Sequence, residues 1–86
     1  MLTKKLLLIK QLGCMPCEVM QPKAIELANK YNIGYGIIDR REIEESIRPT
    51  FTPYFFLLDP EGNKIAEWGG ALEKIDKLET MIKENI

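Results

Sequence analysis

The sequence predicts one α/β domain with a four-stranded mixed sheet. Its elements follow the order β-α-β, a connector holding a short helix or loop, then β-β-α. Three observations predict this fold: short apolar runs of strand length, two stretches with apolar residues at helical spacing, and turn residues between them. A chain of 86 residues can bury one hydrophobic core. We therefore expect residues 1–86 to form a single domain.

The first half of the chain is typical of a strand, a helix and a second strand. Residues 6–9 form a continuous apolar run, as in a strand covered on both faces. Residues 15–31 place apolar side chains on one helical face, and Asn32 and Gly34 then end the helix. Residues 35–39 follow as the second strand. Two strands joined by one helix predict a parallel, right-handed crossover.

The second half predicts a hairpin and a final helix. Residues 40–49 are mostly charged and indicate a solvated connector with one or two helical turns. The most apolar run, residues 54–58, is the expected central strand. Residues 59–63 include Pro, Gly and Asn, which favour turns. They join it to a strand at residues 64–68, where apolar and polar residues alternate. Residues 72–82 carry one apolar stripe of a final helix.

Charge and hydropathy exclude several classes of protein. Lys and Arg number 12 against 13 Asp and Glu, a net charge of −1, and no basic stripe indicates a nucleic acid or an anionic membrane as partner. The apolar run at residues 6–9 is ended by Lys10, too early for a signal peptide or a membrane span. We expect a monomer in the cytoplasm, where a closely spaced cysteine pair is seldom a structural disulfide.

The residues with the clearest chemistry are Cys14 and Cys17, which lie between the first strand and its helix. The start of a helix offers unpaired backbone N–H groups and a favourable dipole. Both stabilise a thiolate and lower the pKa of a cysteine placed there. Pro16 suits the first turn, and the spacing brings the two sulfurs within disulfide reach. Cys14 could then attack a disulfide, and Cys17 could resolve the product.

Two other interpretations of the cysteine pair are open. A structural zinc site needs four ligands, usually Cys or His, and the chain has two cysteines and no histidine. A zinc site shared by two chains would meet that need. The cysteines could also be incidental features of a binding module. The expectation favoured here is redox chemistry without a metal.

A resemblance to a known family supports this expectation. The run from Gly13 to Pro22, continued by residues 24–28, resembles the active-site helix of thioredoxins. That family has Cys-Gly-Pro-Cys there, with a second proline eight residues after the first cysteine, where Pro22 stands. In thioredoxins this proline lies inside the helix. A helix beginning after Pro22 is the alternative, and it would leave the cysteines on a loop.

Two further segments resemble thioredoxin. Thr52-Pro53 resembles a residue–cis-proline pair that faces the cysteines and offers backbone groups to an extended substrate; a trans proline opening a strand is the alternative. The stretch from Gly70 to Lys74 is similar to the family's segment before the last helix, where a small residue lets a substrate approach. The resemblance implies substrate-binding roles for Met15, Pro16, Thr52, Pro53 and Gly70.

The chain also departs from the thioredoxin pattern. Gly13 stands where thioredoxins carry Trp, and Leu8 replaces a buried Asp generally given a role in moving the proton of the second cysteine. Trp68 is expected to serve packing rather than substrate contact. The family's extra strand and helix before residue 6, and much of its third helix, have no counterpart, so the size is closer to that of glutaredoxins.

Size and motif therefore point to different electron donors. A glutathione site would need partners for two carboxylates and an ammonium group. Lys10 is the one cation close to the cysteines in sequence, and Glu73 comes too late after Gly69-Gly70 to match the glutaredoxin acid. The resemblance implies a thiol–disulfide oxidoreductase that acts on protein disulfides. It would use the redox-active Cys14–Cys17 disulfide and no other cofactor, with a flavin-dependent thioredoxin reductase as donor and glutathione as the alternative.

Overall fold

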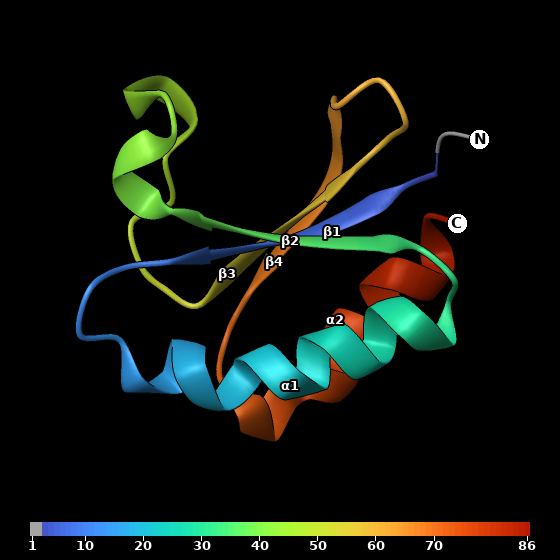
Figure 1. The fold of residues 1–86 in the computed structure, drawn as a ribbon, viewed down its shortest axis with the longest axis horizontal. Helices are drawn as coiled ribbons and strands as arrows, with labels where there is room; N and C mark the ends of the chain where they lie inside the picture. Colours follow the sequence, from blue (N-terminus) through green and yellow to red (C-terminus); the bar gives the residue numbers. More distant parts are fainter. Residues whose placement is uncertain (1–2) are drawn as a thin grey trace.

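The computed structural model describes residues 3–86 and forms a four-stranded sheet with two helices (Figure 1). The elements in chain order are β1 (Lys5–Lys10), α1 (Met15–Lys30), β2 (Gly34–Asp39), β3 (Tyr54–Leu58), β4 (Lys64–Gly69) and α2 (Ile75–Glu84). The sheet order is β2-β1-β3-β4. β1 runs parallel to β2 and antiparallel to β3, which pairs with β4 in a hairpin. The predicted element order and the four-stranded mixed sheet are confirmed.

Both helices lie on one face of the sheet, where the main core forms (Figure 1). Side chains at alternate positions of the strands point to this face, as the two-residue period of a strand requires. Helix α1 continues through Pro22, so the alternative of a helix beginning after that residue is wrong. The fully buried residues of this core are Leu6, Leu8, Met20, Ala24, Phe55, Leu78 and Ile82.

The opposite face of the sheet is covered less completely. Ile9 and Phe56 pack there against Ile43 of the connector, whereas Leu7 stays partly exposed. The Nζ of Lys64 lies 5.0 Å from the centre of the Phe56 ring, so a lysine stem shields part of this face. The expectation that residues 6–9 are covered on both faces is met by the helices on one side and only partly on the other.

The connector between β2 and β3 is held by its own arginines. The Arg40 Nε donates a hydrogen bond to the carbonyl of Pro49 at 2.5 Å, and Arg48 donates to the carbonyl of Ile43 at 2.8 and 3.0 Å. At its start, hydrogen bonds from Arg41 lower the pKa of Asp39 to about 2. Two short 3-10 turns, Arg40–Glu42 and Glu45–Ile47, fulfil the prediction of helical turns. The connector is therefore more ordered than a solvated segment, because its charged side chains satisfy its own backbone carbonyls.

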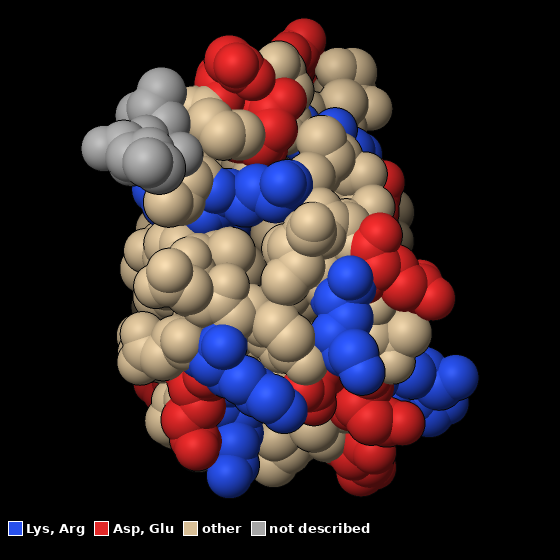
Figure 2. All heavy atoms as spheres, turned by 90° about the vertical axis from the view of Figure 1, so that its right-hand side faces the viewer, with Lys and Arg blue, Asp and Glu red and all other residues tan. Residues whose placement is uncertain are grey.

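Acidic and basic side chains alternate over the end of the molecule shown in Figure 2, in keeping with the small net charge. Near the close of α1, Lys30 and Tyr31 both donate hydrogen bonds to Glu79 of α2, at 2.5 and 2.6 Å, and so tie the two helices together. Across residues 3–86, the structure contains no helix with the length and apolar character that a membrane span requires.

Candidate active site

Cys14 caps the first turn of α1. Its backbone is extended, with φ −84° and ψ 93°, and its Sγ accepts a hydrogen bond from the backbone N–H of Cys17 at 3.1 Å. The preceding Gly13 has φ 81°, a conformation that favours glycine, so a large residue there would strain the backbone. The N–H of Cys17 in the first turn of α1 points at the Cys14 sulfur, where it and the helix dipole would stabilise a thiolate.

The two cysteines are joined and differ in exposure. Cys14 and Cys17 form a disulfide with Cα atoms 5.3 Å apart. Cys17 is 3% exposed and faces the core, whereas Cys14 is partly exposed. Between them, Met15 is 65% exposed and Pro16 is also exposed. A partner molecule can therefore reach the Cys14 sulfur, while Cys17 is protected behind it.

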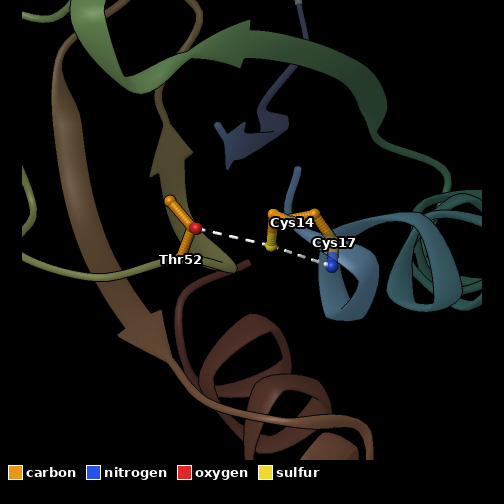
Figure 3. The surroundings of a disulfide bond; sticks show 3 residues. All are labelled: Cys14, Cys17 and Thr52. Carbon is orange, nitrogen blue, oxygen red and sulfur yellow. Dashed lines mark hydrogen bonds between the residues drawn. A yellow bond between two sulfur atoms is a disulfide. The ribbon is translucent and has the colours of Figure 1, made fainter. Parts of the chain in front are cut away.

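Thr52 and Pro53 lie beside the disulfide, just before β3. The Thr52–Pro53 peptide bond is cis, as the resemblance implied. The Thr52 hydroxyl donates a hydrogen bond to the Cys14 Sγ at 3.4 Å (Figure 3). Pro53 is buried, and its carbonyl accepts a hydrogen bond from the N–H of Gly70 at 3.4 Å. Residues that are far apart in the sequence thus converge on one sulfur.

Gly70 has a packing reason of its own to be glycine. A Cβ at this position would lie 2.7 Å from the Trp68 ring, closer than real contacts allow. The Trp68 ring in turn stacks on Phe55, with ring centres 6.2 Å apart. Trp68 therefore packs against the core, as predicted. The close approach that Gly70 permits in this structure is to an aromatic ring of the same chain.

A small pocket opens on the β2 side of the disulfide, and sequence reasoning did not find it. Its volume is about 110 Å³, and both cysteines line it. Because β2 and β3 flank β1 on opposite sides, this pocket and Thr52 approach the disulfide from different directions. Leu8 is fully buried in the main core, and Glu18 is the one carboxylate of the pocket lining. The other lining residues are Lys10, Gln11, Leu12, Gly13, Gln21 and Ile37.

Within residues 3–86, no cluster of three or more His, Cys, Asp or Glu side chains could hold a metal ion. A zinc site in one chain would need such a cluster. The cysteine pair by itself supplies two sulfurs, which suffice for disulfide exchange.

Sequence reasoning also missed Phe51. This residue precedes Thr52 directly and is 49% exposed. Its ring meets Tyr54 edge to face, with centres 5.4 Å apart. An aromatic residue in a turn beside Thr52-Pro53, outside any strand or helix pattern, was the available signal.

No protein-family model matches the chain, and a search of curated proteins gives no match either. Solved structures do match. The thioredoxin pre-protein of Schistosoma mansoni is 29% identical with a TM-score of 0.78, over 98% of this chain and 80% of that one. Deadhead, a germline-specific thioredoxin of Drosophila melanogaster, is 26% identical with a TM-score of 0.77, over 98% and 82%. Thioredoxin 1 of Thermosipho africanus is 26% identical with a TM-score of 0.69, over 93% and 91%.

These similarities span nearly the whole chain and include the region of the cysteine pair. Fold, cysteine spacing and the cis-proline beside the sulfurs agree with one another. The chain has a thioredoxin-like fold and is a thiol–disulfide oxidoreductase.

Proposed function

We propose that this protein reduces disulfides in other proteins, with Cys14 as the nucleophile and Cys17 as the resolving cysteine. The observation that carries the proposal is the unequal exposure of the two sulfurs at the start of α1. Cys14 can meet a substrate sulfur in solvent. Cys17 is nearly buried and lies within bonding distance of Cys14, so it is suited to resolve the bond that Cys14 forms.

The reaction takes place in two exchanges. The Cys14 thiolate attacks one substrate sulfur, and the electron pair of the substrate disulfide passes to the other sulfur, which takes a proton from solvent. Cys17 then loses its proton and attacks the Cys14 Sγ. The bond between Cys14 and the substrate breaks, and the second substrate sulfur leaves as a thiolate. The substrate has gained two electrons, and the protein holds the Cys14–Cys17 disulfide.

The surface around Cys14 supports a protein substrate. Leu12 is 89% exposed, and Met15 and Phe51 are also exposed. Apolar residues gathered near a reactive sulfur favour contact with an extended polypeptide. Met15, Pro16, Thr52, Pro53 and Gly70 are the residues that we propose contact it.

A flavin-dependent reductase is the proposed electron donor. Glutathione would need charged partners for its two carboxylates and its ammonium group, and each missing charged hydrogen bond costs about 1.5–3 kcal/mol. Lys10 lies in the pocket beside both sulfurs and could meet one carboxylate. Glu73 is exposed on the short turn Leu72–Lys74, three residues after Gly70. Lys10 alone would leave the second carboxylate and the ammonium group of glutathione without charged partners. We therefore favour a protein reductase as the donor.

A comparison of two reducing systems tests this choice. We expect turnover of a protein disulfide such as insulin to be at least about tenfold faster with NADPH and thioredoxin reductase than with glutathione and glutathione reductase. A Cys14→Ser variant controls for direct reduction by either system. Efficient turnover by the glutathione system, with none from thioredoxin reductases, would contradict the proposed donor and leave the oxidoreductase chemistry intact.

We also propose that the protein works as a monomer in the cytoplasm. A dithiol that cycles between two states suits a reducing compartment, where structural disulfides are rare. The Cys14–Cys17 bond closes within one chain, so the reaction needs no second copy.

A further inference from the structure

Phe51 is an exposed aromatic residue at the edge of the site. It lies between two buried prolines, Pro49 and Pro53, yet nearly half of its own surface, 49%, faces solvent. Large aromatic side chains contribute much of the energy at protein interfaces when a partner covers them. An exposed ring one residue from Thr52 is therefore placed to contact whatever reaches the cysteines.

The Phe51 ring is held in a defined position. It meets Tyr54 edge to face at 5.4 Å, and the Tyr54 hydroxyl donates a hydrogen bond to Glu67 at 2.8 Å. Gly69 makes room for both rings: a Cβ there would lie 2.7 Å from the Phe51 Cζ and would also collide with Tyr54. A ring fixed before binding loses little conformational entropy when a partner covers it.

Phe51 directly precedes the residue that contacts the reacting sulfur. The Cα atoms of Phe51 and Thr52 are about 3.8 Å apart, as for any consecutive residues. The Thr52 hydroxyl lies 3.4 Å from the Cys14 Sγ. An extended segment advances about 3.3 Å per residue. A substrate whose cysteine reaches Cys14 can thus bring a neighbouring residue, one to four positions away, to the Phe51 ring.

We propose that Phe51 determines substrate specificity by packing against a large apolar side chain within a few residues of the substrate cysteine. The inference rests on the proposed function and adds the chemistry of the preferred substrate. Leu12 and Met15 are exposed as well, but Phe51 is the aromatic residue of the three, and its ring is held against Tyr54. The partner is accordingly an extended protein segment that is apolar beside its disulfide.

Two synthetic peptides test the proposal. Both carry the same intramolecular disulfide, and they differ at the two positions on each side of each cysteine, which are Leu in one peptide and Asn in the other. We expect the wild-type protein to favour the Leu peptide in kcat/KM by about fivefold to tenfold, chiefly through KM. Phe51→Ala should reduce this preference to about onefold to twofold. Reduction of hydroxyethyl disulfide, which lacks flanking residues, should be the same in both proteins.

Ile65→Ala is the matched control. Ile65 is 39% exposed near the start of β4, at the end of the strand away from Gly69 and Tyr54. This variant should keep the wild-type preference, and circular dichroism should show that both variants fold. Phe51→Leu, which keeps apolar surface, should retain part of the preference. A Phe51→Ala protein that still favours the Leu peptide would overturn the role of Phe51. So would a wild type that reduces both peptides equally well. Failure of the wild type to reduce either peptide would overturn the proposed function together with the inference.

Discussion

Replacing Cys17 with serine is expected to stop the reaction at a mixed disulfide between Cys14 and the substrate. Without the Cys17 sulfur, no group inside the protein can attack the Cys14 Sγ, to which Cys17 is bonded in the oxidised state. Incubating Cys17→Ser with a protein disulfide should give a covalent complex, seen on a non-reducing gel and dissolved by dithiothreitol.

The matched variant is Cys14→Ser, which keeps Cys17 and loses the accessible sulfur. It should form no stable complex and lose turnover by about 10³-fold or more, as enzymes do when their covalent nucleophile is removed. Alkylation of the reduced wild type should modify Cys14 before Cys17. If Cys17 were alkylated first, or if Cys14→Ser trapped the substrate instead, the assignment of roles would be reversed.

Replacing Phe55 with alanine is expected to lower the free energy of unfolding by about 3–5 kcal/mol. Phe55 is fully buried in the middle of the sheet, where it pairs in register with Leu8 of β1 and Trp68 of β4 and stacks on the Trp68 ring. Removing its ring leaves a cavity between the sheet and the helices. Small domains have about 5–15 kcal/mol of stability in total, so the variant would be marginal.

Urea unfolding followed by far-ultraviolet circular dichroism measures this loss without depending on Trp68 fluorescence. Ile65→Ala serves as the control, because a partly exposed residue at the edge of the sheet should change stability by only about 0.5 kcal/mol. A loss below about 1 kcal/mol for Phe55→Ala would show that the core does not depend on this ring.

The elements that the sequence predicted well are those set by local chemistry. The strand Tyr54–Leu58 has the predicted bounds, because an apolar run lies between Pro53 and a turn with Pro, Gly and Asn. The cysteine pair was predicted from its spacing and its place before the first helix, the cis Thr52–Pro53 bond from a resemblance in sequence, and the structure places them together. Pattern and spacing therefore sufficed for the reacting atoms.

Features that depend on how side chains pack in the folded chain were not predictable. The position of the Phe51 ring follows from its contact with Tyr54 and from the missing side chain of Gly69. The hydrogen bond from Arg48 to the carbonyl of Ile43 depends on the folded path of the connector, which its charged sequence does not specify. The pocket on the β2 side arises only when Ile37 is brought beside Cys17. Each of these features is a property of packing rather than of periodicity.

A single-turnover reaction tests the central claim that Cys14 and Cys17 form a dithiol that reduces protein disulfides. The fully reduced wild type is mixed with an equal amount of oxidised insulin, with no other reductant, and then analysed by intact mass and peptide mapping. We expect each protein molecule to lose its pair of thiol hydrogens, to contain the Cys14–Cys17 disulfide and to leave an equal number of reduced insulin disulfides. Protein that kept both free thiols, or that ended in a disulfide between two chains, would contradict the account.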